Sequence, residues 1–153
     1  MPQKVLFLVR GLPGSGKSTV ALNIRNAEIF STDDQFMIDG EYRFDSSKLG
    51  QAHSQTQWNT LEYLQSNNGL PNCVVANTFT QRWEIEPYLR IAEQAGARVV
   101  VVDTFDGGLT DEELAEKNIH GVPLESIRAM RERWEHDWRK GNPRAPWERK
   151  GRK

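Results

Sequence analysis

The stretch Val5-Leu6-Phe7-Leu8-Val9-Arg10-Gly11-Leu12-Pro13-Gly14-Ser15-Gly16-Lys17-Ser18-Thr19 decides the fold of this chain. Its first five residues are apolar and have the length of a buried strand. Residues 11–18 then match the pattern G-x-x-x-x-G-K-[ST], and residues 17–24 read as the helix that follows. A strand, a glycine-rich loop and a helix in this order are typical of a phosphate-binding loop, so we expect the chain to bind a nucleoside triphosphate.

The residue types in this loop have specific tasks. The glycines allow the backbone to curl around phosphate oxygens, and the start of the helix favours an anion. Lys17 is expected to reach the β- and γ-phosphates and to act in catalysis, while the Ser18 hydroxyl is expected to ligate Mg²⁺. ATP and Mg²⁺ are therefore the predicted cofactors. The residues predicted to contact the nucleotide here are Leu12, Pro13, Gly14, Ser15, Gly16, Lys17, Ser18 and Thr19.

Length and composition suit one soluble domain. The chain has 153 residues, of which 37% are hydrophobic and 27% charged, with no apolar stretch long enough for a membrane span and no signal peptide. The single cysteine, Cys73, excludes an internal disulfide and is typical of a cytoplasmic protein. Because Cys73 begins an apolar run, we interpret it as an inert core thiol.

Apolar runs alternate with helical patterns, which predicts an α/β fold: a P-loop NTPase-type three-layer sandwich with a mostly parallel central sheet. Helices are expected at 46–65, capped by Ser46 or Ser47, at 83–94, and at 124–138, where a stripe of apolar residues predicts core packing. The predicted strands are residues 5–9, 28–31, 73–76 and 99–102.

Active sites of parallel sheets lie at the carboxyl ends of their strands. The second predicted strand runs into Asp33 and Asp34, which places two carboxylates near the γ-phosphate. Such a carboxylate can accept a proton from an attacking hydroxyl or orient Mg²⁺ through its water shell, and Asp34 is predicted to contact the substrate. One of the two can instead cap a short helix that begins at Gln35.

The third predicted strand leads to Asn77, Thr78 and Arg82, a set that suits a substrate with hydroxyl and phosphate groups. The same stretch also reads as a helix start in which Thr80 is the cap. Asp103 follows the fourth strand as a weak match to a magnesium-binding carboxylate, or as ordinary turn chemistry.

The order of motifs resembles the small P-loop kinases related to the kinase domain of phage polynucleotide kinase and to the P-loop domain of NEDD4-binding protein 2, a group that includes phage 5-hydroxymethyluracil DNA kinases. The segments that carry the resemblance are Gly11–Thr19, Asp33-Asp34, Gly40–Phe44 with Leu49 and Ala52-His53, Asn77-Thr78 with Arg82-Trp83-Glu84 and Pro87-Tyr88, and Lys117-Asn118 with His120-Gly121-Val122-Pro123, Ile127 and Met130.

This resemblance implies an adenylate-kinase-like or polynucleotide-kinase-like fold with a short lid. It implies that Asp33 is the general base, that Asn77 touches the acceptor, and that Lys117 leans over the phosphates from the lid. Phe36 stands where polynucleotide kinase has an arginine for the substrate phosphate, and Lys117 stands where relatives have an arginine. The identity of the acceptor therefore stays open.

We expect a kinase domain at residues 1–138, a lid at about 108–123 and a basic tail at 139–153. The polar segment 110–121 suits a mobile lid, or an exposed charged helix. The tail carries seven basic residues against one acid, with Trp147 among them. It suits a nucleic-acid contact, a solubilising disordered tail, or a segment that packs on the acidic body.

The predicted function is an ATP-dependent kinase that transfers the γ-phosphate to a hydroxyl of a nucleic-acid acceptor. The acceptor is a 5′-hydroxyl end or a hydroxymethylated base in DNA, such as 5-hydroxymethyluracil. The alternatives are a kinase of a free nucleoside, nucleotide or small metabolite, and a non-catalytic nucleotide-dependent binding module. A catalytic base beside the acceptor site separates these classes, because a binding module does not need one.

Overall fold

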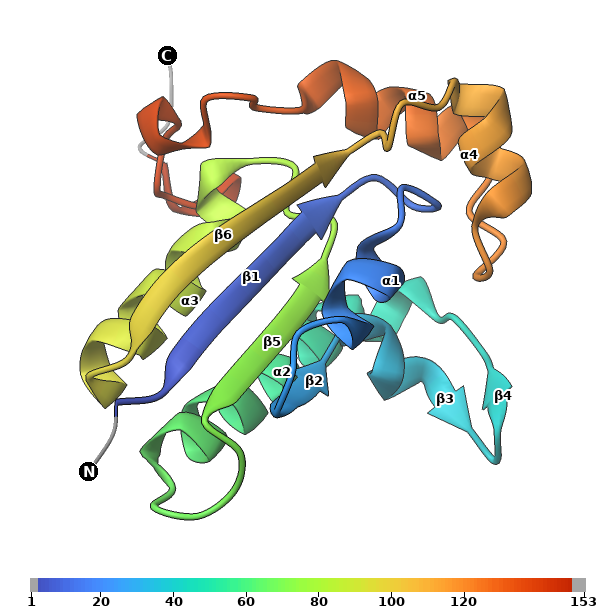
Figure 1. The fold of residues 1–153 in the computed structure, drawn as a ribbon. Helices are drawn as coiled ribbons and strands as arrows, with labels where there is room; N and C mark the ends of the chain where they lie inside the picture. The colour runs from blue at the N-terminus through green and yellow to red at the C-terminus, as the bar shows by residue number, and fades with distance from the viewer. Residues whose placement is uncertain (1–2, 150–153) are drawn as a thin grey trace.

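A computed structural model describes residues 3–149 of the chain. Its centre is a parallel four-stranded sheet in the order β2-β5-β1-β6 (Figure 1). The strands are β1 (Val5–Gly11), β2 (Ala27–Phe30), β5 (Asn72–Asn77) and β6 (Arg98–Phe105). Val9 lies opposite Ala76 and Val102, so the carboxyl ends of the three longest strands meet at one edge of the sheet. The predicted α/β class with a parallel sheet is confirmed.

Helices cover both faces of the sheet and its carboxyl edge. Figure 1 shows α2 and α3 together behind the sheet, α1 in front of it, and α4 and α5 beyond the tips of β1 and β6. The helices are α1 (Lys17–Leu22), α2 (Leu49–Gln65), α3 (Arg82–Ala95), α4 (Asp111–Lys117) and α5 (Leu124–Arg133). The smaller elements are the 3-10 helices η1 (Thr32–Phe36), η2 (Ser46–Lys48), η3 (Trp138–Lys140) and η4 (Pro146–Glu148), and the hairpin of β3 (Met37–Ile38) with β4 (Glu41–Tyr42).

The core follows from the alternation of side chains along β1. Leu6 and Leu8 are fully buried in a cluster with residues of α2 and α3, whereas Val9 packs with Ala21 of α1 on the opposite face. A third cluster at the carboxyl edge joins Leu12 to Leu114 and to residues of α5. Hydrophobic packing therefore holds β1 before the phosphate loop, Leu12 within it and α1 after it.

The prediction for the last long helix was wrong at its C-terminal end. The helix α5 ends at Arg133, and the chain then turns so that the Glu135 N–H donates to the Thr80 carbonyl at 2.8 Å. Trp134 stays in the cluster with Ile127, but Trp138 lies in the main core with the residues of α3. Tertiary contacts of the two tryptophans with different clusters therefore end a helix that the apolar periodicity alone would continue.

Two helix caps also differ from the sequence prediction. Asp45, not Ser46 or Ser47, caps η2 by accepting from the Ser47 N–H at 3.0 Å. Gln81, not Thr80, is the N-cap of α3, and the Thr80 hydroxyl donates to Glu84 at 2.7 Å. The helix α1 also ends two residues earlier than expected, at Leu22. Among residues 3–149 we find no helix with the length and apolarity that a membrane crossing requires.

Candidate active site

The phosphate-binding loop joins β1 to α1 and is fixed by the neighbouring strand β6. The Leu12 N–H donates to the Phe105 carbonyl at 2.8 Å, and the hydroxyls of Ser15 and Thr104 share a hydrogen bond of 2.7 Å. Gly14 and Gly16 have φ angles of 83° and 100°, a conformation that residues with a Cβ rarely adopt. The loop therefore has the backbone shape that a nest of N–H groups for an anion requires.

Lys17 and Ser18 occupy the first two positions of α1. The Lys17 ammonium donates to the Leu12 carbonyl at 3.1 Å across the loop. Burial lowers the pKa of Lys17 to about 8, and the charge of Asp33 opposes this change, so the two side chains lie within electrostatic reach of each other. Ser18 and Thr19 are exposed, whereas Leu12 and Pro13 are buried and offer a ligand only their backbone.

The two neighbouring acids have different surroundings. Asp34 accepts from the Ser31 N–H at 3.1 Å in a capping box, so it is the acid that caps η1. Asp33 takes no part in this cap. The start of η1 is held by Asn77, whose side-chain carbonyl accepts from the Thr32 N–H at 2.9 Å. Asn77 thus ties the end of β5 to the helix that presents Asp33.

Both carboxylate oxygens of Asp33 have partners from other segments. The Tyr42 hydroxyl donates to one oxygen at 3.0 Å, and Nε2 of His120 lies 3.4 Å from the other. The Tyr42 and His120 rings are 4.1 Å apart between centroids. Burial, and then the Asp33 charge, raise the pKa of Tyr42, which keeps this hydroxyl a donor. The carboxylate is therefore oriented by the hairpin and by the loop after α4, while its side chain stays 48% exposed.

The sequence did not single out Tyr42 or give His120 a role, although both lie in segments that carry the family resemblance. A signal was present at Asp39-Gly40, because an Asp-Gly pair between two short strand-forming segments is typical of a hairpin turn. That this hairpin would return to Asp33 depends on the tertiary structure. It could not be read from spacing.

Thr78 and Arg82 lie in the connection between β5 and α3. The Thr78 carbonyl accepts from the Gly11 N–H at 3.2 Å and so fixes the start of the phosphate loop. The Arg82 guanidinium donates to Glu86 at 2.7 Å and to the Arg139 carbonyl at 2.9 Å. Through these contacts Arg82 attaches the C-terminal segment to α3. A contact of Arg82 with a substrate phosphate stays a prediction.

The predicted lid segment contains the capped helix α4. Thr110 and Glu113 form its capping box, and Leu114, within the helix, is fully buried. A Cβ on Gly14 would lie 2.8 Å from the Leu114 carbonyl, so α4 rests directly on the phosphate loop. Lys117, at the C-terminal end of α4, is exposed. Arg131 joins α5 to this region through Asp106 at 2.8 Å and Asp111 at 2.6 Å.

Arg10, directly before the loop, is fully buried. Its guanidinium pairs with Asp103 at 3.0 Å, donates to the carbonyls of Phe79 and Thr80, and lies 3.9 Å from the centre of the Trp134 ring. Burial lowers the pKa of Arg10, and Asp103 opposes this. The weak magnesium-site match at Asp103 is therefore explained by an ion pair between adjacent strands. From the sequence, Arg10 was interpreted only as the residue that ends the apolar run 5–9.

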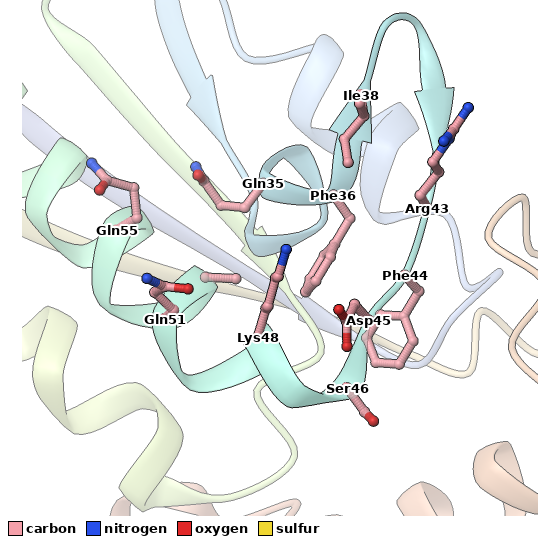
Figure 2. A pocket seen from close by; sticks show the side chains of 11 residues that line it. Gln35, Phe36, Ile38, Arg43, Phe44, Asp45, Ser46, Lys48, Gln51 and Gln55 are labelled. Atoms are coloured by element: carbon pink, nitrogen blue, oxygen red, sulfur yellow. The ribbon is translucent and has the colours of Figure 1, made fainter.

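A hollow of about 680 Å³ lies beside η1, between the β3–β4 hairpin and the start of α2 (Figure 2). Its lining combines aromatic, amide and charged side chains. It is formed by Gln35, Phe36, Ile38, Arg43, Phe44, Asp45, Ser46, Lys48, Gln51, Ala52 and Gln55. This volume lies within the range of small-molecule sites in proteins.

The sheet, loop and following helix define a P-loop α/β protein. The family model AAA_33, described as "AAA domain", matches residues 6–136, and the chain therefore belongs to this family. NEDD4-binding protein 2 of Homo sapiens is 38% identical over 137 residues, which cover 86% of this chain and 8% of that protein. The predicted relation to the small P-loop kinases is confirmed.

Two solved structures share the fold. A chain of the Pnkp1/Rnl/Hen1 RNA repair complex superimposes with a TM-score of 0.69 at 17% identity, covering 94% of this chain and 48% of the other. A gluconokinase from Sinorhizobium meliloti gives a TM-score of 0.52 at 19% identity, with 88% and 75% covered. The chain spans between 7% and 11% of the length of the curated relatives that it matches.

Proposed function

We propose that this protein is an ATP-dependent kinase that phosphorylates a hydroxyl group. The observation that carries the proposal is the Asp33 carboxylate, which is held by Tyr42 and His120 within electrostatic reach of Lys17. A nucleotide-dependent binding module needs the loop but not an oriented carboxylate beside it. The pairing of the two features supports phosphoryl transfer.

In the proposed reaction, the backbone of the loop and Lys17 bind the triphosphate, and Asp33 accepts the proton of the acceptor hydroxyl. The hydroxyl oxygen forms a bond to the γ-phosphorus while the bond to the β–γ bridging oxygen breaks, which leaves ADP. Ser18, exposed at the start of α1, fits as the protein ligand of Mg²⁺. The ion would neutralise the charge of the β- and γ-phosphate oxygens. Lys117 extends from the end of α4 as a further cation for the phosphates.

We propose a nucleic-acid acceptor, either a 5′-hydroxyl end or a hydroxymethylated base. The acceptor would meet Asp33 from the side of the hairpin, near Asn77 and Thr78. Asp34 belongs to this side through its place on η1, although its carboxylate caps that helix. The basic residues of segment 139–149 add a surface that suits a phosphate backbone. A kinase of free nucleosides, nucleotides or small metabolites is the second candidate, because Phe36 is buried and supplies no charge for a terminal phosphate.

Transfer of a labelled γ-phosphate tests the proposal, with 5′-hydroxyl oligonucleotides, DNA containing 5-hydroxymethyluracil, nucleosides and gluconate as acceptors. We expect Lys17→Ala to abolish transfer and weaken ATP binding. Asp33→Asn should lower kcat by roughly 100-fold while the ATP dissociation constant stays unchanged, because the base acts only on the acceptor.

Asp34→Asn is the matched control, since it alters the neighbouring acid, whose carboxylate caps η1. It should retain most of the activity. Transfer by the wild type to none of these acceptors, or an Asp33→Asn variant with the wild-type kcat, would contradict the proposed function.

A further inference from the structure

We propose that the hollow between η1, the β3–β4 hairpin and α2 binds the nucleobase of a nucleotide acceptor whose hydroxyl is presented to Asp33. This inference rests on the proposed function and specifies the substrate class of the same site. The hollow has about 680 Å³ of space, and no other role described for the molecule uses it. The side chains that line it offer three kinds of contact to a nucleotide.

The first is an aromatic platform. Phe44 is 53% exposed, whereas the neighbouring Phe36 is 3% exposed. The two ring centroids are 5.0 Å apart, so the buried ring supports the exposed one. Figure 2 shows both rings at the hollow. A flat, supported aromatic surface open to solvent is what base stacking requires.

The second is a set of primary amides. Gln35 comes from η1, while Gln51 and Gln55 come from the first turns of α2, and Figure 2 shows all three on the walls of the hollow. Each amide offers both a donor and an acceptor, the combination that reads the hydrogen-bonding edge of a base. A polyol without an aromatic ring would not stack on Phe44 and would not present the hydrogen-bonding edge that these amides can recognise.

The third is positive charge. Lys48 extends into the hollow in Figure 2, and Arg43 stands on its rim with a side chain that is 60% exposed. The only acid of the lining, Asp45, accepts from the N–H and the hydroxyl of Ser47 at 3.0 and 2.6 Å. Its charge is therefore directed to the cap of η2. Arg43 pairs with Glu41 at 2.8 Å, and Lys48 is the cation of the lining that can meet a phosphate of the ligand.

The hollow is connected to the proposed base through η1. This 3-10 helix carries both Asp33 and Phe36, and a rise of about 2 Å per residue places them roughly 6 Å apart along its axis. Tyr42 bridges the two, since its hydroxyl bonds Asp33 and its ring meets Phe36 edge to face with centroids 6.3 Å apart. The Phe44 ring centroid lies a further 5.0 Å from that of Phe36, so a base stacked on Phe44 would lie within the length of a nucleotide from Asp33.

The test compares Phe44→Ala with Trp58→Ala, which removes another exposed aromatic ring, 59% exposed on α2, outside the hollow. A fluorescent 5′-hydroxyl dodecathymidylate serves as the probe for both transfer and equilibrium binding. We expect Phe44→Ala to raise the KM and the dissociation constant for this probe about 10-fold, with an unchanged KM for ATP. Phe44→Trp should restore both values, and Trp58→Ala should leave them unchanged.

The outcomes separate this inference from the proposed function. Wild-type probe binding and KM in Phe44→Ala, or an equal effect of Trp58→Ala, would overturn the nucleobase site while the kinase proposal stands. Efficient transfer to gluconate but none to the probe or to nucleosides would also overturn it. Absence of transfer to every acceptor would refute the kinase, and the binding measurement would still decide whether Phe44 holds a nucleobase.

Discussion

The adjacent residues Asp33 and Asp34 have carboxylates with different partners and therefore different proposed roles. In η1, Asp34 turns back to the Ser31 N–H, and Asp33 faces Tyr42 and His120. A capping box needs its acid at the third helical position, which leaves the preceding acid free. The sequence predicted the pair and both tasks. The spacing of residues alone could not assign them, because the assignment depends on which residue is the N-cap; only the family resemblance singled out Asp33.

Cys73 provides a test of the core at the residue scale. It is fully buried in β5, and burial raises the pKa of its thiol to about 12. We therefore expect less than a few per cent reaction with a disulfide reagent such as DTNB at pH 8 in the folded protein, because the thiolate is the nucleophile. The same reagent should modify Cys73 fully in denaturant.

Rapid modification of the folded protein would show that β5 is open to solvent.

The raised pKa of the Cys73 thiol also makes the stability of the folded protein depend on pH. The thiol stays protonated in the folded state while the unfolded chain releases its proton, so stability from this group is present below pH 9 and falls as the pH rises toward 12.

At the scale of elements, the predicted helices and strands were accurate where a local pattern of residues marks the end of the element. The phosphate loop, β1 and α3 were all predicted to within two residues because glycine and apolar runs act locally, and Gly96, whose φ is 70°, ends α3. The end of α5 and the β3–β4 hairpin were not. Their limits depend on tertiary contacts, of Trp134 with Arg10 and of Tyr42 with Asp33, that no local pattern of residues marks.

The attachment of α4 to α5 gives a prediction about the lid. Arg131 binds Asp106, Asp111 and the Leu109 carbonyl, and its side chain is 30% exposed. Arg131→Gln should increase the hydrogen-exchange rate of the α4 amides by roughly 10-fold, since several charge-assisted bonds are lost. ATP binding should weaken as well, because α4 rests on Gly14.

Arg128→Gln is the control for this variant. It removes a pair with Glu112 whose side chains are 55% and 65% exposed, and such surface pairs contribute little. Equal exchange rates in the two variants would mean that Arg131 does not hold α4 in place.

At the scale of the whole molecule, the C-terminal segment belongs to the folded body. Trp138 is 8% exposed in the main core, and the Arg82 and Arg139 guanidiniums lie 5.7 and 4.6 Å from its ring centroid. The Trp147 ring meets Trp83 at 5.3 Å. Of the alternatives for this segment, packing on the body describes residues 138–149, and a contact with nucleic acid stays a prediction. Residues 150–153 of the predicted tail lie outside the described residues.

A pair of tryptophan variants measures this attachment. Trp138→Ala should lower the free energy of unfolding by about 3 kcal/mol, because a buried aromatic ring is lost from the core. Trp147→Ala should change it by less than about 0.5 kcal/mol, since that side chain is 76% exposed. Urea unfolding followed by circular dichroism gives both values. Similar small changes in the two variants would place Trp138 outside the cooperative core.

The burial of Arg10 dictates an order of events during protein synthesis. Strand β1 carries a cation whose counterion, Asp103, is synthesised 93 residues later, and whose aromatic cover, Trp134, is synthesised later still. Enclosing an unpaired guanidinium is costly, so β1 cannot be enclosed between its neighbouring strands before these partners are available. The phosphate loop that follows β1 is therefore completed only after Trp134 has been synthesised.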